Sequence, residues 1–292
     1  MYDFALTSLV AFGVAREKGE KQMYPFEVFL DMGLYEICLL IGVLCAFFLG
    51  DRLGIEKGFS IPLQKTLILS ALLGVVLGSG AAVLFQAFYN FLDSGTFEIV
   101  QNTGATCYGG LIGGAAAFIC SWFVVGKLLC NSDEPKKRFF EIADIAAVCV
   151  PLAHGFGRLG CFFAGCCHGA TTTAWYGVKM YTELGWQTVV PVQLFEAAFL
   201  FVLAGVLFVL FKKDKGKNVA LLSIYLIAYG IWRFFIEFAR ADDRGATVVS
   251  ALTPSQLVAI ILIAVGIGFI FLTKKLKIYQ KDEKENAGKT SV

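Results

Sequence analysis

Charged residues are scarce in this chain of 292 residues, since Asp, Glu, Lys and Arg together make up only 16% of it. An average soluble domain carries about a quarter. Hydrophobic residues make up 57%, and the mean hydropathy is +0.70. These values exclude a soluble globular domain and a disordered chain, because the apolar surface exceeds what one water-soluble core can bury. The protein is therefore expected to have the lipid bilayer as its solvent.

Two further features are missing. The 25 basic residues are nearly balanced by 23 acidic ones and form no concentrated basic face, which excludes a nucleic-acid partner. The sequence has only six prolines and shows neither an internal inverted repeat nor a pair of proline-broken helices. Transporters commonly have both, so their absence argues against a transporter or receptor for an anionic solute, which is one alternative function.

Three stretches contain no Asp, Glu, Lys or Arg: residues 66–92, 99–126 and 245–273. Each is long enough to cross a hydrocarbon layer of about 30 Å. Four other apolar segments contain only a few ionisable residues. The sequence thus predicts an all-α integral membrane protein with seven transmembrane helices in a membrane domain over residues 29–273. The predicted spans are 29–50, 66–92, 99–126, 139–157, 191–212, 218–240 and 245–273.

The basic residues are distributed unevenly over the predicted loops, with 17 of the 25 on one side of the spans. The positive-inside rule makes that side cytoplasmic, so the N-terminus is predicted outside and the C-terminus inside. Residues 1–28 are predicted to be an interfacial segment, residues 274–292 a disordered cytoplasmic tail, and residues 158–190 a small outer loop region.

Three ionisable residues lie within the sixth predicted span. Arg233, Glu237 and Arg240 are spaced four and three apart, which would place them on one face of a helix within about 10 Å of rise. An ion-pair clamp between helices is one interpretation. Two guanidiniums against one carboxylate, near Arg158 at the outer end of the fourth span, favour phosphate binding instead. Glu196 fits equally a carboxylate bonded to the helix start and a functional group.

Other polar residues in the spans have structural interpretations. Glu141 and Asp144 are expected to pair with loop lysines between helices, and the glycines after Tyr108 let a neighbouring backbone approach closely. The hydroxyl of Tyr108 lies in mid-membrane and needs a partner.

A second cluster combines thiols and imidazoles. Residues 154–169 read HGFGRLGCFFAGCCHG and contain His154, Cys161, Cys166, Cys167 and His168. A soft-metal site, a disulfide and a glycine-rich, lipid-binding turn with incidental thiols are all compatible with this run. The spacing matches no standard zinc site, so we predict no metal and no cofactor, and we favour the turn with incidental thiols.

The sequence resembles the bacterial prolipoprotein diacylglyceryl transferase family over about residues 24–275. The matching stretches are LYEICLLIG, FYNF, YGGLIGG, IADIAAVCVPLAHGFGRLGCFFAG, PVQLFEA, YGIWRFFIEFAR and PSQL. The resemblance implies a seven-span protein of the bacterial plasma (inner) membrane. Such a protein moves the diacylglyceryl group of phosphatidylglycerol, or a similar anionic phospholipid, to the lipobox cysteine of a preprolipoprotein signal peptide and releases glycerol phosphate.

The resemblance implies functional positions at Tyr35, Arg158, Gly169, Arg233, Glu237 and Arg240, and the chemistry of Tyr108 and of the thiol and imidazole cluster adds further candidates to the predicted site. Tyr108, Arg158 and Arg233 are predicted to be catalytic. Cys161, His154, Cys166 and His168 are possible additional site residues, and Tyr108, His154 or His168 would be the general base if one is used. The predicted phospholipid-binding residues are Tyr35, Arg158, Gly169, Arg233, Glu237 and Arg240.

The chain departs from the family pattern at several positions. The family pattern GRxGNFxNGE is read here as GRLGCFFAGC over residues 157–166, which replaces two Asn and the Glu. Tyr108 stands where the family has His, and Ala82 stands where it has Arg. The sequence therefore indicates a divergent, cysteine-bearing member, and a phospholipid-dependent transferase with a different acceptor is the alternative enzyme.

Overall fold

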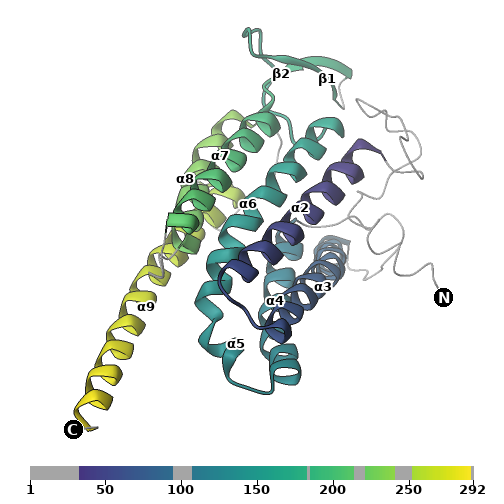
Figure 1. The fold of residues 1–292 in the computed structure, drawn as a ribbon. Coiled ribbons are helices and arrows are strands. Elements are labelled where there is room, and N and C mark those ends of the chain that lie inside the picture. Colours follow the sequence, from purple (N-terminus) through teal and green to yellow (C-terminus); the bar gives the residue numbers. More distant parts are fainter. Residues whose placement is uncertain (1–32, 95–106, 183–184, 214–220, 241–251, 291–292) are drawn as a thin grey trace, which may run out of the picture. The chain divides into compact units, whose positions relative to one another are not determined.

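The computed structural model describes residues 33–94, 107–182, 185–213, 221–240 and 252–290 (Figure 1). Seven helices in this part of the chain are long and apolar enough to cross a membrane. This confirms the predicted all-α integral membrane protein and its seven helices. The helices are α2 (Leu34–Glu56), α3 (Ile61–Ser94), α4 (Cys107–Cys130), α6 (Phe139–Phe163), α7 (Val192–Lys213), α8 (Leu221–Ile236) and α9 (Pro254–Thr290), joined by the short α5 (Glu134–Lys137) and the 3-10 turn η1 (Glu237–Ala239).

The chain divides into two compact units. Unit 1 consists of residues 1–142 and 159–165, and unit 2 of residues 143–158 and 166–292. Helices α2 to α5 belong to unit 1, whereas α7, α8 and α9 belong to unit 2. Helix α6 contributes residues to both units.

Unit 1 is organised around the close approach of α3 and α4, which run side by side (Figure 1). A Cβ atom on Gly78 would lie 2.9 Å from Cα of Gly114 and 3.0 Å from the carbonyl oxygen of Gly110. A Cβ on Gly113 would collide with Cβ of Ala81. The glycines that follow Tyr108 therefore serve helix packing, as small residues commonly do in membranes.

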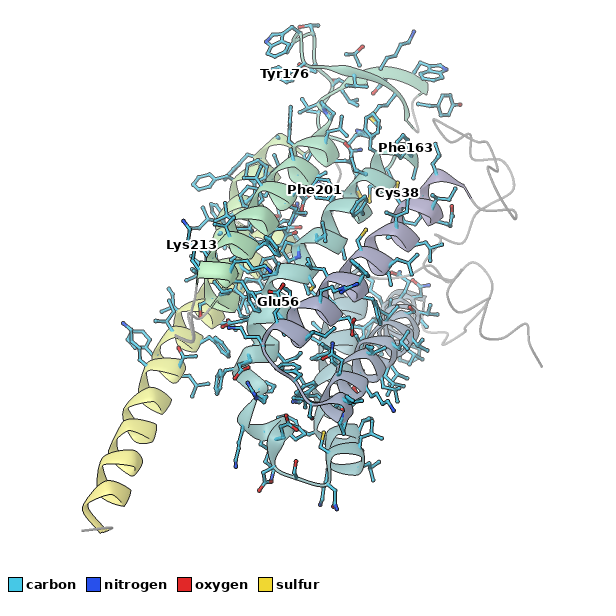
Figure 2. All side chains as sticks on the ribbon, viewed as in Figure 1. Cys38, Glu56, Phe163, Tyr176, Phe201 and Lys213 are labelled. Atoms are coloured by element: carbon cyan, nitrogen blue, oxygen red, sulfur yellow. The ribbon has the colours of Figure 1, made fainter. Side chains whose placement is uncertain are left out.

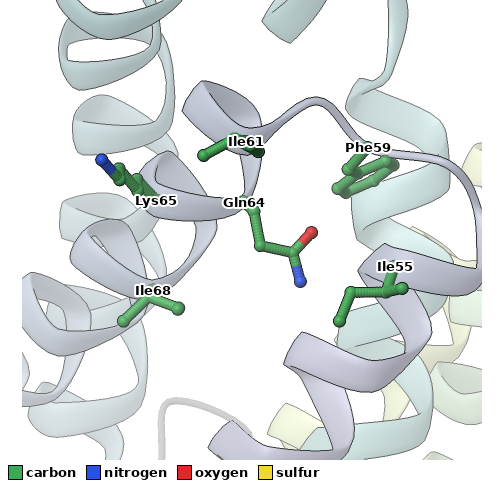
Figure 3. Close-up of a pocket in the computed structure, with 6 residues that line it drawn as sticks. All are labelled: Ile55, Phe59, Ile61, Gln64, Lys65 and Ile68. Carbon is green, nitrogen blue, oxygen red and sulfur yellow. The ribbon is translucent and has the colours of Figure 1, made fainter.

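A pocket of about 370 Å³ lies at the turn between α2 and α3 (Figure 3). The side-chain amide of Gln64 donates hydrogen bonds to the carbonyl oxygen (2.6 Å) and the carboxylate (2.7 Å) of Asp51, and so ties the two helices together beside it. The residues that line the pocket are Ile55, Phe59, Ile61, Gln64, Lys65 and Ile68. None of them belongs to the predicted site.

Unit 2 combines its helices with a small extramembrane sheet. Strands β1 (Val178–Thr182) and β2 (Gly185–Val189) form an antiparallel hairpin with Val178 opposite Val189. Asp144 on α6 accepts a hydrogen bond of 2.8 Å from the backbone N–H of Leu221, the first residue of α8. Because that N–H has no partner within its own helix, the carboxylate caps α8.

Several details differ from the sequence predictions. The predicted outer loop of residues 158–190 is helical up to Phe163, and the sequence did not predict the hairpin inside it. Residues 274–290, predicted to be disordered, continue α9 as helix, in keeping with their good helix formers Lys, Glu and Gln. Glu141 pairs with Arg138 at 2.7 Å rather than with a loop lysine. The interfacial segment predicted for residues 1–28 lies outside the described residues, and the orientation of the helices stays a prediction.

Candidate functional site

Helices α6, α7 and α8 of unit 2 bring together ionisable side chains in the interior of the unit. Glu196 on α7 is completely buried, and its Oε2 lies 3.0 Å from Nε of Arg158 on α6. The hydroxyl of Tyr229 on α8 donates a hydrogen bond of 2.9 Å to Oε1 of the same carboxylate. The sequence left two interpretations of Glu196 open. The structure pairs it with an arginine and a tyrosine.

Arg233 forms a second pair, one turn further along α8 than Tyr229. Its Nη2 atom donates a hydrogen bond of 2.9 Å to Ser255 and lies 3.0 Å from Oε2 of Glu237. The hydroxyl of Thr253 donates to Oε1 of Glu237 at 3.0 Å. Only 4% of Arg233 is exposed, and among the described residues its buried Nη1 atom has no hydrogen-bond acceptor. A buried cationic donor in this state costs free energy until an acceptor arrives.

The charge balance of this site differs from the balance predicted from sequence. The sequence predicts Arg233 and Arg240 against the single carboxylate of Glu237, with Arg158 nearby. Glu196 adds a second carboxylate, so Arg158 and Arg233 each have a carboxylate within 3.0 Å. Breaking one such buried pair would leave an uncompensated charge, which costs about 3 to 5 kcal/mol.

Arg240 is not on the same helical face as Arg233, and this corrects the predicted ladder. Helix α8 ends at Ile236, η1 follows, and Arg240 has an extended backbone with φ −90° and ψ 151°. Here it forms an antiparallel bridge with Gly169, and the N–H of Ala170 donates 3.1 Å to the carbonyl of Ala239. After the helix, the chain thus pairs through its backbone with the segment that follows α6.

Gly169, a predicted phospholipid-binding residue, has a structural reason to be glycine. A Cβ atom at this position would lie 2.5 Å from the carbonyl oxygen of Ala239 and 2.7 Å from Cγ2 of Val192. Its own N–H donates 2.9 Å to the carbonyl of Val190. The two neighbouring segments thus leave no space for a side chain.

Both histidines of the chain belong to unit 2. The ring of His154, one turn before Arg158 on α6, meets the ring of Tyr229 edge to face at 5.2 Å. Nδ1 of His168 lies 2.9 Å from the carbonyl of Gly169, which can only accept a hydrogen bond. A neutral His168 therefore carries its proton on Nδ1 and has Nε2 as its basic nitrogen.

The structure assigns the other predicted site residues to different parts of the chain. Tyr35 lies in the first turn of α2 in unit 1, and its Cδ2 atom lies 3.0 Å from where a Cβ on Gly160 would be. Tyr108 lies in the first turn of α4, and its side chain falls outside the described residues. Cys161 is in the last turn of α6 and belongs to unit 1, whereas Cys166 and Cys167 belong to unit 2. The three interpretations of these thiols stay open.

Sequence reasoning missed several residues that complete the site. Tyr229 lies four residues before Arg233, and this helical spacing could have revealed it. Ser255 lies in the PSQL stretch. Gln193 lies in the PVQLFEA stretch and is 1% exposed, and its side chain donates a hydrogen bond of 2.6 Å to the carbonyl of Cys166. Their partners are distant in sequence, so spacing alone could not identify these contacts.

Known proteins resemble this chain over most of its length. The prolipoprotein diacylglyceryl transferase family matches residues 24–272. Phosphatidylglycerol–prolipoprotein diacylglyceryl transferase 2 of Clostridium perfringens is 33% identical over 260 residues, which are 86% of this chain and 94% of that protein. The phosphatidylglycerol–prolipoprotein diacylglyceryl transferase of Clostridium tetani is 32% identical over 84% of this chain and 95% of its own length. The Ehrlichia ruminantium protein of that name is 28% identical over 84% and 93%.

Proposed function

This chain belongs to the prolipoprotein diacylglyceryl transferase family, and from that premise we propose that it transfers a diacylglyceryl group from phosphatidylglycerol to a cysteine thiol of a lipoprotein precursor. Membership makes the chain a transferase and leaves the transporter alternative without support. The proposed acceptor is the lipobox cysteine of a preprolipoprotein signal peptide, and the proposed location is the bacterial plasma (inner) membrane. A phospholipid-dependent transferase with a different acceptor is the alternative.

The observation that carries this proposal is the incomplete hydrogen bonding of the buried Arg233 guanidinium. Its Nη2 is held by Ser255 and Glu237, while its buried Nη1 has no acceptor among the described residues. A phosphate oxygen supplies the acceptor that this donor needs, and guanidinium hydrogen bonds to phosphate are strong because both partners are charged. Arg158, fixed by Glu196, would be the second phosphate ligand.

In the proposed reaction, the acceptor thiolate attacks the glycerol carbon that carries the phosphoester. A C–S bond forms, the C–O bond to the phosphate oxygen breaks, and glycerol phosphate leaves with the electron pair of that bond. Arg158 and Arg233 would stabilise the negative charge that develops on the leaving oxygen. A free cysteine has a pKa of about 8.5, and nearby guanidiniums favour the thiolate.

Glu196 and Tyr229 would act on Arg158 rather than on the lipid. The carboxylate lies 3.0 Å from Nε of Arg158, and Tyr229 holds the other carboxylate oxygen at 2.9 Å. This arrangement fixes the plane of the guanidinium before the lipid arrives. Preorganised charge stabilises a transition state without reorganisation during the reaction.

The family resemblance supports the assignment of the phospholipid-binding residues, and side-chain chemistry supports the other candidates. Tyr35, Gly169, Glu237 and Arg240 are proposed phospholipid-binding residues, and Tyr108 is a proposed catalytic residue. His154 and His168 are the other candidates for a general base.

The direct test uses purified protein, isotopically labelled phosphatidylglycerol and a lipobox peptide. Mass spectrometry should detect a diacylglyceryl thioether on the peptide cysteine and release of glycerol phosphate. A peptide with Ser in place of that Cys is the matched control and should stay unmodified. If the lipid is consumed while the cysteine peptide stays unmodified, the acceptor assignment is wrong. If no lipid is consumed with any thiol peptide, the proposed reaction is wrong.

A further inference from the structure

Trp175 stands out in unit 2 because 94% of its surface is exposed. It lies in the turn before β1, next to Tyr176, which is 41% exposed. The proposed reaction uses neither ring. A tryptophan that the fold leaves uncovered is costly in water, because a large apolar ring stays hydrated.

The turn that carries Trp175 is built to hold it in place. The backbone N–H of Ala174 donates 3.1 Å to the hydroxyl of Thr172, and the N–H of Gly177 donates 2.9 Å to the carbonyl of Ala174. A Cβ on Gly177 would lie 2.7 Å from Cγ2 of Thr188, so the turn packs tightly against β2. Trp175 is thus displayed on a fixed turn.

Ring contacts connect this turn to the membrane span of α7. Tyr176 meets Phe195 edge to face at 6.1 Å, and Trp175 meets Tyr176 edge to face at 5.7 Å. Phe195 is 38% exposed and lies about one helical turn inside the start of the span at Val192. Figure 2 shows Tyr176 beyond the start of α7 and Lys213 at the other end of that helix.

The two ring contacts limit how far Trp175 can lie from the membrane span of α7. Two ring-to-ring contacts separate it from a side chain that is itself within the span. The head-group region covers about 5 to 7.5 Å on each side of the hydrocarbon layer. A turn this close to the start of α7 can reach this region, where tryptophan and tyrosine rings are enriched because one side of each ring system is apolar and the other polar.

We propose that Trp175 and Tyr176 form a membrane anchor that inserts between phospholipid head groups beside the start of α7. The occupant of this surface is the lipid interface itself, with the indole N–H available to ester and phosphate oxygens. The proposal does not depend on the proposed reaction.

The anchor is connected to the candidate site through the backbone. The N–H of Thr172 donates 2.9 Å to the carbonyl of Thr188, and the same segment pairs through Gly169 with Arg240. Fixing the turn at the head groups would thus fix the height of the segment that holds Arg240. The hairpin would act as a depth reference for the site.

Fluorescence quenching tests the anchor in the full-length protein, reconstituted into phosphatidylcholine nanodiscs. The emission of Trp175 is obtained as the difference between the unaltered protein and Trp175→Phe. Trp186 is the matched control, measured in the same way with Trp186→Phe, because it is 58% exposed and lies nearer the hairpin tip, opposite Tyr181. Both substitutions keep an aromatic ring, and circular dichroism checks that each variant is folded.

We expect lipids brominated near the head-group end of the acyl chain to quench most of the Trp175 emission. Acrylamide in the water phase should quench it several-fold less than it quenches Trp186. Trp175 emission that acrylamide quenches and bromolipids do not would overturn the proposal. A third outcome would also overturn it: bromolipids do not quench Trp175, but a lipobox peptide protects it from acrylamide. This outcome would identify a polypeptide-binding surface instead.

Discussion

Two helix interfaces of this protein, one in each unit, bring membrane helices together by different means. In unit 1, α3 and α4 approach through glycines, so that a Cβ on Gly78 would lie 2.9 Å from Cα of Gly114. In unit 2, α6, α7 and α8 meet through buried charges, with Glu196 placed between Arg158 and Tyr229. Both arrangements hold helices in contact without a hydrophobic driving force, which lipid removes.

The difference shows where function resides. The contact between α3 and α4 needs no ligand, because close packing of two backbones at glycines leaves no side chain in want of a partner. The charged interface includes Arg233, whose Nη1 has no acceptor among the described residues. Buried ionisable groups are expensive in a membrane, so an incompletely satisfied one indicates a ligand, whereas the glycine stripe indicates only packing.

The largest effect is expected from Arg233→Lys, which keeps the charge but removes the planar fork. Turnover with phosphatidylglycerol should fall by at least about 100-fold, as after the loss of an oxyanion ligand. Initial rates of thioether formation measure this. Arg52→Lys is the control and should keep normal activity, because Arg52 is exposed and lies over the Phe48 ring. Unchanged turnover in Arg233→Lys would show that the charged interface, like the glycine interface, only holds helices together.

Glu196→Gln tests the charged interface of unit 2 by removing the negative charge that faces Arg158. We expect kcat to fall about 10-fold to 100-fold, because the Arg158 guanidinium loses its orienting carboxylate. Inhibition by glycerol phosphate should become stronger, because the freed positive charge attracts the anion. Glu141→Gln is the control, since its partner Arg138 is partly exposed and such pairs contribute little. Weaker inhibition together with lower kcat would indicate that Glu196 only supports the fold.

Gly169→Ala tests the backbone pairing that positions Arg240. The added Cβ would lie 2.5 Å from the Ala239 carbonyl oxygen, so the bridge must separate. We expect the KM for phosphatidylglycerol to rise about tenfold with a smaller change in kcat, since Arg240 would lose its place. Gly205→Ala on α7 has nothing within 4 Å of the new Cβ and should match the unaltered protein. Equal KM values for the two variants would contradict this role.

The smallest effect on catalysis is expected in the glycine interface. Gly78→Ala should lower the free energy of unfolding by about 1 to 3 kcal/mol, because the helices must move apart. Activity per folded molecule should stay normal. Gly80→Ala, two residues along α3 and with open space at its Cβ, should be neutral or slightly stabilising. Thermal unfolding in detergent compares the two, and equal midpoints would show that α3 and α4 do not depend on this contact.

Hydropathy and charge were sufficient to predict the seven helices, because a span must be predominantly apolar over about 20 residues whatever its neighbours are. They also indicated Arg158 and Arg233, since an arginine in an apolar helix is conspicuous in sequence. Helix ends were less predictable. Arg240 lies outside the helix and pairs instead with Gly169, about 70 residues earlier in the chain.

Tertiary structure alone decided which charges meet. Glu196 had two equally good interpretations in the sequence, and neither identified the partners that the structure gives its carboxylate, Arg158 at 3.0 Å and the hydroxyl of Tyr229 at 2.9 Å. The exposure of Trp175 could not be predicted from the sequence either, because nothing in the neighbouring residues tells whether the fold covers the ring. Local pattern determines where the chain crosses the membrane. Pairing between distant side chains depends on how the helices pack, and no local pattern records it.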